Sequence, residues 1–279
     1  MERVRRSILG IIFLPLILLT ACAKAPYTQR SQLMLISQAE ENQLGIDAFQ
    51  QVLSEEKVSR DPTLQQTVDR IGRRIANKAG RDDFQWQFVV LDNDKTVNAF
   101  ALPGGKVAVY TGMFPVARTE GGLAAVMAHE VAHVLARHGG ERLSQGLVAQ
   151  MGAVAVQAGM AGSNPTVVRG VMAAYGLGAN VGDLLPYSRL QESEADRIGL
   201  VLMAEAGYDP REAVHLWERM ARENGGRPPE FLSTHPSPAQ RIQDLNQQMP
   251  NALTYYRASA AQPNESTRLL PGVGGGDAR

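Results

Sequence analysis

The sequence predicts an α+β fold that is mostly helical and contains one small β-sheet. Apolar residues recur at helical spacing along most of the chain. Short alternating or apolar runs typical of strands occur only between residues 84 and 110. The chain has 279 residues, 44% of them hydrophobic, which is enough for one sizeable core.

Residues 1–21 have the pattern of a secretory signal. Arginines at the start precede an apolar stretch, Ile8 to Leu19, that is too short to span a bilayer comfortably. A tether of polar residues is expected at 22–37, before the predicted domain at 38–255.

Cys22 is the only cysteine, so no intramolecular disulfide can form. It ends the tetrapeptide Leu19-Thr20-Ala21-Cys22, which resembles the bacterial lipobox, whose cysteine is lipidated. The alternative is an ordinary cleaved signal with a chance cysteine. We favour lipidation of Cys22, which would anchor the protein to a membrane without a spanning helix. The following Ala23 suggests the outer membrane.

The first two helices are expected at 38–53 and 62–75. Asp61 is a candidate cap for the second helix, with Pro62 in its first turn. Strands are expected at 84–91, 97–102 and 106–110, and Pro103-Gly104-Gly105 forms the turn between the last two.

The rest of the predicted domain is helical. The helix from Leu123 to Arg137 should stop at Gly139-Gly140. The helix at 146–162 is buried or packed on the surface, with a membrane-touching role as the alternative. Polar composition after residue 255 predicts a disordered tail at 256–279. Further helices are expected at 167–181, 188–206, 210–222 and 236–248, with a Gly/Pro-rich loop at 224–230.

The charge balance argues against nucleic acid as a partner. Lys and Arg number 28, Asp and Glu also number 28, and the formal net charge is zero. No basic run is interleaved with aromatic residues, so nucleic-acid binding is set aside.

A metal-binding pattern occurs in His129-Glu130-Val131-Ala132-His133. Two histidines four positions apart on a helix project from one face and can share one ion. Glu130 lies about 100° round the helix and can reach a metal-bound water. A bound zinc ion lowers the pKa of such a water and polarises a carbonyl, while a carboxylate takes the proton. The alternative is a helix with two incidental histidines.

A peptidase zinc of this kind takes a third protein ligand. His138 lies about 180° from His129 on a continuous helix, so we expect it to face away as a helix-end residue. Glu192 is the candidate ligand, and Asp196, on the same helical face, can accept a hydrogen bond from a ligand histidine. Glu194 is expected to point elsewhere. The alternative for this segment is a solvated, acidic helix face.

The motif His129-Glu130-x-x-His133, followed by Glu192-x-x-Ala195-Asp196, resembles the gluzincin family of CAAX-prenyl-endopeptidase, HtpX and Oma peptidases. The resemblance covers residues 38–250 and is nearest to the periplasmic BepA/LoiP/YcaL branch. It implies a zincin-type fold with the small sheet beside the motif helix. It also implies one zinc ion per chain, held by His129, His133 and Glu192, with Asp196 behind them.

Two further segments are similar to this family. Asn98, Ala99 and Phe100 match the strand before the zinc helix, whose edge would pair with an extended peptide substrate. The alternative for Asn98 is a strand-end turn residue. His235 in His235-Pro236 matches a loop residue near the zinc. It would stabilise the oxyanion or occupy the open coordination position and hold the enzyme shut.

The resulting hypothesis is a lipid-anchored periplasmic zinc endopeptidase that cleaves misfolded or misassembled envelope proteins. One alternative is a chaperone-like outer-membrane assembly factor with a structural or gated zinc, and another is a binding-only lipoprotein. The sequence lacks the multiple membrane spans of the HtpX type and the C-terminal helical repeats of the BepA type. Prenylated substrates and a dedicated docking platform are therefore not expected.

Overall fold

The computed structural model describes residues 22–159, 188–222, 231, 235, 238–258 and 263–273. The signal segment expected at 1–21, the helix at 167–181 and the loop at 224–230 lie outside these residues. The chain divides into two compact units. The first comprises residues 1–38 and 139–183, and the second comprises residues 39–138 and 184–279.

The first unit contains a short hairpin and all of the helix α6 (His138–Gly159) except its first residue, His138, which belongs to the second unit. Strands β1 (Cys22–Lys24) and β2 (Ser31–Leu33) pair antiparallel. The Arg30 guanidinium donates two hydrogen bonds, of 2.8 and 2.7 Å, to the Glu141 carboxylate on α6. The Leu35 amide donates to Ser144 Oγ at 2.8 Å. The tether expected at 22–37 is thus folded onto the start of α6, because its polar residues find buried partners there.

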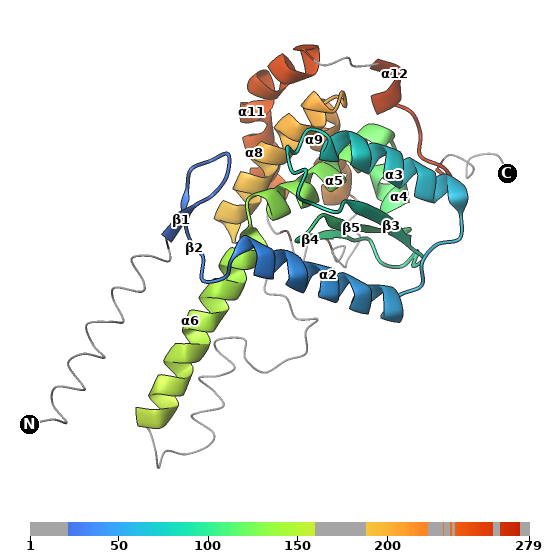
Figure 1. Ribbon diagram of the computed structural model, residues 1–279. Helices are drawn as coiled ribbons and strands as arrows, with labels where there is room; N and C mark the ends of the chain where they lie inside the picture. Colours follow the sequence, from blue (N-terminus) through green and yellow to red (C-terminus); the bar gives the residue numbers. More distant parts are fainter. Residues whose placement is uncertain are drawn as a thin grey trace, which may run out of the picture. The chain divides into compact units, whose positions relative to one another are not determined.

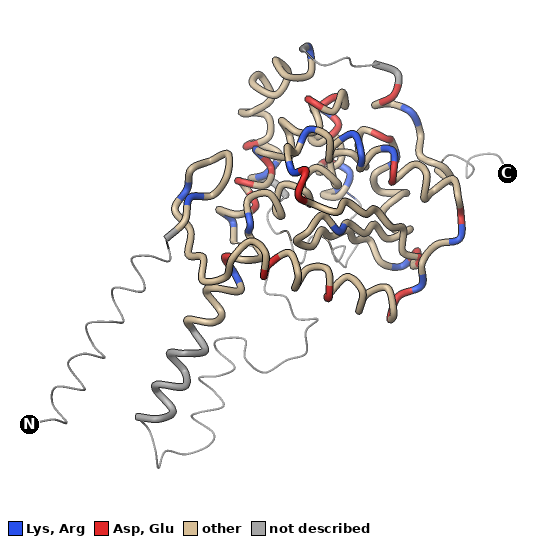
Figure 2. The backbone as a smooth tube through the Cα atoms, viewed as in Figure 1, with Lys and Arg blue, Asp and Glu red and all other residues tan. Residues whose placement is uncertain are grey.

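A three-stranded sheet forms the centre of the second unit (Figure 1). Its order is β3-β5-β4, so β4 is an edge strand. Strand β5 pairs parallel with β3 and antiparallel with β4. The three strands are largely uncharged, as the tan tube in Figure 2 shows. Their bounds are Gln87–Leu91 for β3, Ala99–Leu102 for β4 and Lys106–Tyr110 for β5.

Helices cover both faces of this sheet. On one face, Phe49 of α2 (Gln38–Glu55) packs with Val89 and Leu91. On the other face, α3 (Pro62–Ala76) packs against β3. Asp61 caps α3 as expected, because its Oδ1 accepts the Thr63 amide at 2.7 Å. The mostly helical α+β prediction is confirmed.

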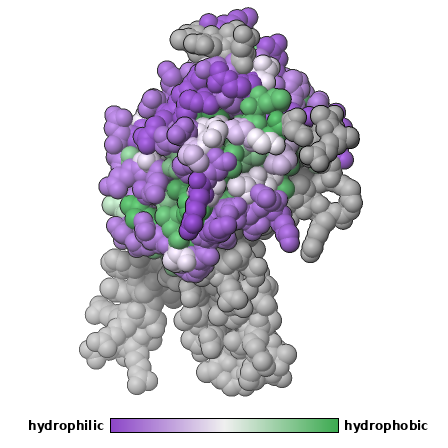
Figure 3. All heavy atoms as spheres, turned by 90° about the vertical axis from the view of Figure 1, so that its right-hand side faces the viewer, coloured by the Kyte–Doolittle hydropathy of each residue, from purple (hydrophilic) through white to green (hydrophobic). Residues whose placement is uncertain are grey.

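Helix α5 (Glu120–Leu135) is buried along its whole length. Its packing partners in the second unit include α3, β4 and three further helices. Those helices are α4 (Met113–Ala117), α8 (Arg189–Glu205) and α9 (Arg211–Arg222); α11 (Pro238–Ala258) packs on α8 and α9. The outer face drawn in Figure 3 is mainly hydrophilic, consistent with apolar side chains being directed into this core.

The chain turns sharply after α5. Arg137 has φ of 59°, a left-handed conformation that ends the helix, and α6 begins at the next residue, His138. The expected stop at Gly139-Gly140 is therefore wrong, since both glycines lie inside α6. Arg137 Nε donates to Glu41 Oε2 at 2.6 Å, which holds the turn.

Residues 263–273 contact the core, in contrast to the disordered tail expected at 256–279. The Glu120 amide donates to the Arg268 carbonyl at 2.9 Å, and the Leu270 amide to the Arg118 carbonyl at 2.9 Å. Leu270 is only 2% exposed. The buried side chain of Leu270 thus anchors a segment whose average composition is polar. This segment begins with α12 (Pro263–Ser266), and α11 also extends to Ala258.

No helix among the described residues is both long enough and apolar enough to serve as a membrane span.

Candidate metal centre

Helix α5 places His129, Glu130 and His133 in the interior, each at most 5% exposed. The two imidazoles project from one helical face, and their Nε2 atoms lie 3.0 Å apart. The i, i+4 spacing therefore produces the convergence that the motif predicts.

Two other elements of the second unit bring Glu192 and His235 to these histidines. Glu192 lies in the first turn of α8, and its Oε1 is 3.3 Å from His133 Nε2. Nδ1 of His235 is 3.2 Å from His129 Nε2 and 2.8 Å from Glu192 Oε1. We call His129, His133, Glu192 and His235 the metal group. Their four ligand atoms lie within 4.8 Å of one another, and all four residues are buried.

These distances fit a zinc ion. Zinc bound tetrahedrally with bonds of about 2.0–2.1 Å to nitrogen or oxygen separates neighbouring ligand atoms by roughly 3.3 Å. Four of the six separations between these ligand atoms, at 2.8 to 3.3 Å, are close to that value. Imidazole nitrogen and carboxylate oxygen are also ligands that zinc takes in proteins.

A glycine allows α8 to approach α5 closely enough to form this group. A Cβ at Gly199 would lie 3.0 Å from the His129 amide nitrogen and 3.1 Å from the Ala128 carbonyl. The two backbones are therefore in near contact beside the metal group. Ser188 begins α8 with a capping box shared with Gln191, which fixes where Glu192 falls in the first turn.

Glu130 borders the metal group without belonging to it. Its Oε1 lies 3.3 Å from His235 Nε2. Burial raises the pKa of Glu130 above its ordinary value of 4.5. A raised pKa suits a carboxylate that must take up a proton near neutral pH.

Asp196 lies on the outer, Nδ1 side of His129, and Nη2 of Arg241 lies 2.9 Å from both ring nitrogens of His129. Asp196 Oδ1 lies 3.0 Å from His129 Nδ1. The Arg241 guanidinium donates two hydrogen bonds to Asp196, of 2.6 and 2.7 Å, and its Nη1 lies 2.7 Å from Glu192 Oε2. Arg241 also stacks over the Trp217 ring at 3.9 Å. Sequence reasoning assigned no role to Arg241, because a single arginine after a Pro-rich loop has no diagnostic spacing.

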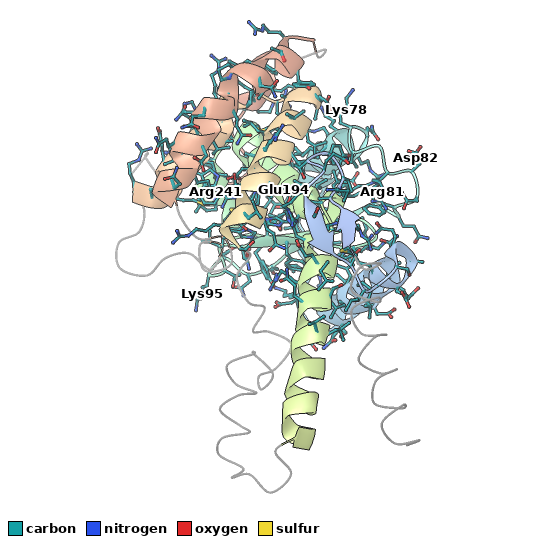
Figure 4. All side chains as sticks on the ribbon, turned by 90° about the vertical axis from the view of Figure 1, so that its left-hand side faces the viewer. Lys78, Arg81, Asp82, Lys95, Glu194 and Arg241 are labelled. Atoms are coloured by element: carbon teal, nitrogen blue, oxygen red, sulfur yellow. The ribbon has the colours of Figure 1, made fainter. Side chains whose placement is uncertain are left out.

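His138 holds the outer side of His133, contrary to expectation. Its Nδ1 lies 2.9 Å from His133 Nδ1, and its Nε2 lies 3.0 Å from Glu194 Oε2. His138 was expected to face away and Glu194 to point elsewhere. The expectation for His138 is wrong because the turn at Arg137 ends the helical periodicity on which it depended, whereas Glu194 does not belong to the metal group. Figure 4 shows Glu194 and Arg241 in the interior, whereas Lys78 and Asp82 lie toward the periphery.

The two ligand histidines have opposite electrostatic environments. Burial and the charge of Arg241 act to lower the pKa of His129, but Asp196 and Glu192 outweigh them and raise it to about 9. Burial lowers the pKa of His133 well below 6.5. Burial acts to raise the pKa of Glu192, yet its hydrogen bonds to the three histidines of the metal group hold that pKa far below its usual range.

The strand segment expected to bind substrate lies beside the motif helix. Ala99 and Phe100 open the edge strand β4, which packs against α5. The Asn98 side-chain oxygen Oδ1 accepts a hydrogen bond from the Ala99 amide at 2.9 Å. The backbone carbonyl of Asn98 accepts one from the Tyr110 amide at 3.1 Å. Asn98 therefore fixes the beginning of the edge strand.

The segment that carries His235 is attached to the same edge. The Phe231 amide donates to the Val97 carbonyl at 3.1 Å, and the His235 amide donates to the Phe231 carbonyl at 2.9 Å. The rings of Phe231 and His235 stack with centroids 4.4 Å apart. His235 is thus held between the edge-strand region and the metal group.

Comparison with known proteins agrees with this geometry. Residues 62–249 match the model of Peptidase family M48. The chain belongs to peptidase family M48. The prediction of a zinc metallopeptidase with one metal group per chain is therefore confirmed.

Two named relatives are mitochondrial and one is bacterial. The chain is 39% identical over 232 residues to the mitochondrial metalloendopeptidase OMA1 of Schizosaccharomyces pombe, covering 81% of this chain and 66% of that protein. It is 30% identical over 280 residues to OMA1 of Saccharomyces cerevisiae, covering 93% and 79%. It is 31% identical over 248 residues to the beta-barrel assembly-enhancing protease of Escherichia coli, covering 84% of this chain but only 48% of that protein.

Proposed function

We propose that this M48 metallopeptidase is a lipid-anchored periplasmic endopeptidase that cleaves misfolded or misassembled envelope proteins. The observation that carries the endopeptidase activity is the buried group of His129, His133 and Glu192 with Glu130 beside it. A purely structural zinc site has no need of a carboxylate such as Glu130 next to its ligands.

The catalytic role of each residue follows from its position. When bound at the metal group, zinc supplies the polarisation of a substrate carbonyl and the activation of a water molecule. Glu130 acts as the general base, because its pKa is raised by burial, and then returns the proton to the leaving amine. Asp196 orients His129 through Nδ1, which leaves Nε2 directed at the other ligand atoms.

We propose that the edge strand β4 binds the substrate. An extended peptide can add to an unpaired strand edge through backbone hydrogen bonds, which require little side-chain specificity. Among the described residues, strand β4 pairs with β5 alone, and it packs against the motif helix. Asn98, Ala99 and Phe100 would position the peptide there. Loose specificity of this kind suits unfolded or misassembled protein substrates.

His235 is proposed to act as a gate rather than as an oxyanion stabiliser. A catalytic zinc site keeps one coordination position open for water or substrate. Nδ1 of His235 lies 3.2 Å from His129 Nε2 and 2.8 Å from Glu192 Oε1, at ligand separation from both. Withdrawal of His235 would therefore be needed before a substrate enters.

The position of His235 also supports a second function, that of a chaperone-like assembly factor with a gated zinc site. In that case the shut site would be the working state of the protein, and cleavage would be a minor activity. One bacterial relative is named a beta-barrel assembly-enhancing protease, which joins assembly and proteolysis in a single name.

The lipid anchor is proposed at Cys22. The support is the tetrapeptide Leu19-Thr20-Ala21-Cys22 and the absence of a second cysteine from the sequence. Replacing Cys22 with Ser should move the protein from the membrane fraction to the soluble periplasmic fraction. Retention of the Cys22→Ser protein in the membrane fraction would rule out this anchor.

The Glu130→Gln variant tests the catalytic proposal. It should bind one equivalent of zinc and lose at least about a thousandfold of the casein-cleaving activity. Glu55→Gln, at an exposed position on α2, is the matched control and should cleave at the wild-type rate. Full proteolysis by purified Glu130→Gln would show that the mechanism is wrong.

The His235→Ala variant separates the gate from the oxyanion role. Removal of a gate should raise casein cleavage, whereas removal of an oxyanion donor should lower it about a hundredfold or more. Zinc bound by the wild type with no cleavage by either wild type or His235→Ala would favour the assembly factor.

A further inference from the structure

His138 is buried and contacts His133 on the side that faces away from the metal group. It is 0% exposed, and its ring centroid lies 4.9 Å from that of His133 at an interplanar angle of 71°. The left-handed backbone of Arg137 lies between the end of α5 and His138, and the 2.6 Å ion pair between Arg137 and Glu41 holds this turn. The position of His138 is therefore built into the fold and does not depend on a surface loop.

The hydrogen bonds in this region determine which nitrogen carries each proton. Nε2 of His133 faces the metal group, since it lies 3.0 Å from His129 Nε2. A metal-binding nitrogen must offer a lone pair, so the proton of neutral His133 belongs on Nδ1. That proton is donated to His138 Nδ1 at 2.9 Å, and His138 in turn donates from Nε2 to Glu194 Oε2 at 3.0 Å.

We propose that His138 and Glu194 are positioning residues for the metal centre, acting as a chain from Glu194 through His138 to His133. Ligand histidines commonly donate their outer N–H to a carboxylate, a carbonyl or water. Here a second histidine accepts that proton and relays the hydrogen bond to the carboxylate. The chain fixes His133 in the Nδ1–H tautomer and aims Nε2 at the metal group. This inference rests on the proposed metal centre and deepens it.

A merely structural His–Glu pair would fill space and stabilise the turn without selecting a tautomer. The conservative variants separate these two roles. His138→Phe keeps a ring of similar size but removes both hydrogen bonds. His138→Asn loses the ring but keeps an oxygen near the position of Nδ1, which can accept from His133. Glu194→Gln keeps an acceptor for His138, whereas Glu194→Met does not.

Two measurements on the full chain test the proposal. The first is zinc affinity, measured by competition with a chelator of known affinity. His138→Phe and Glu194→Met should weaken zinc binding about 10- to 100-fold, with His138→Asn recovering part of the loss and Glu194→Gln lying within a few-fold of wild type. The second is the nitrogen NMR spectrum of the metal-free protein. It should show His133 as the Nδ1–H tautomer in wild type and as a mixture in His138→Phe.

His215 provides the matched control, because it forms a similar pair with Glu212, at 3.1 Å, but its side chain is 55% exposed. His215→Phe should change neither the zinc affinity nor the His133 spectrum. Wild-type affinity together with an unchanged tautomer in His138→Phe would overturn the inference. The inference is also overturned if His138→Asn binds zinc as weakly as His138→Phe while His133 keeps the Nδ1–H tautomer. If His138→Phe fails to fold, the two Glu194 variants decide the question with the same readouts. A wild-type protein without zinc affinity would instead remove the proposed metal centre itself.

Discussion

The two ligand histidines of α5 lie one helical turn apart, and their Nδ1 atoms have different kinds of hydrogen-bond partner. His129 is backed by a carboxylate, Asp196, which the charged Arg241 clamps. His133 is backed by a second imidazole, His138, with Glu194 one step further out. The pKa of His129 is raised to about 9, whereas burial holds that of His133 well below 6.5. Two histidines of one helical face therefore differ in pKa because carboxylates offset the effect of burial at His129, whereas burial prevails at His133.

The surroundings of His129 and His133 should also differ in how much their disruption destabilises the protein. Asp196 and Arg241 are both charged and nearly fully buried, at 6% and 4% exposed. A buried ion pair costs much when one partner is removed, because the other charge is left uncompensated. On the His133 side, the hydrogen bonds described run from His133 through the imidazole of His138 to the carboxylate of Glu194, so their disruption should cost less.

The largest effect is expected for Asp196→Ala. It removes one of the two carboxylates that compensate the buried Arg241 charge, the other being Glu192 at 2.7 Å, and should destabilise the metal-free protein by about 3 kcal/mol. Glu194→Ala on the other side should cost about 1–3 kcal/mol, the value for a buried donor left unsatisfied. Urea unfolding followed by circular dichroism measures both. An equal loss for the two variants would contradict the asymmetry.

The pH dependence of zinc binding should follow His129. With its pKa raised to about 9, His129 is protonated at pH 7 in the metal-free protein, and zinc must displace that proton. The dissociation constant for zinc should therefore fall about tenfold per pH unit as the pH rises above 7, and it should level off near the pKa of His129. His133, whose pKa lies well below 6.5, adds no slope in this range.

Calorimetry in buffers of different ionisation enthalpy checks this expectation. About one proton should be released per zinc at pH 7. The Asp196→Asn variant loses the carboxylate that raises the pKa of His129, so it should release clearly less than one proton. Equal proton release by Asp196→Asn and wild type would show that His129 is not the group that titrates.

A smaller effect is expected where the two helices touch. Gly199→Ala places a methyl group 3.0 Å from the His129 amide nitrogen and 3.1 Å from the Ala128 carbonyl, and neither backbone group can move freely. It should cost about 1–3 kcal/mol of unfolding free energy and weaken zinc binding by shifting Glu192 away from the histidines. Gly146→Ala on α6 meets nothing within 4 Å and should be neutral or slightly stabilising.

The smallest effect should come from a cap distant from the metal group. Asp61 accepts the Thr63 and Leu64 amides at the start of α3. Asp61→Ala should cost about 1 kcal/mol of unfolding free energy without altering zinc affinity. A loss of zinc affinity in Asp61→Ala would mean that general stability, rather than the groups behind the ligands, controls the metal centre.

The elements whose periodicity is local were predicted well. The strand Lys106–Tyr110 and the capped helix after Asp61 occur with the expected bounds or within one residue of them. The motif helix is also where the sequence places it, because its i, i+4 histidines need only one turn of helix. The zinc metallopeptidase assignment follows from that motif together with the family resemblance.

Long-range features were missed for identifiable reasons. His138 was misplaced because a non-glycine residue with positive φ, Arg137, carries no sequence signal for a helix end. The role of Arg241 depends on Asp196 and Glu192 across a helix interface, which spacing does not reveal. The contact of residues 263–273 with the core does have a signal, the apolar pair Leu269-Leu270, but average composition hides it.

The attachment of residues 263–273 to the start of α5 has a consequence for biosynthesis. The Glu120 amide, at the first residue of the motif helix, has its partner in the Arg268 carbonyl. A ribosome adds about 5–20 residues per second, so the partner of Glu120 becomes available only several seconds after the motif itself. During that interval the nascent chain contains His129 and His133. Glu192, then Arg241 and finally the Arg268 carbonyl are added only later. The metal centre is thus expected to form late, when most of the domain has been made. Until then the chain should have no proteolytic activity toward nearby proteins.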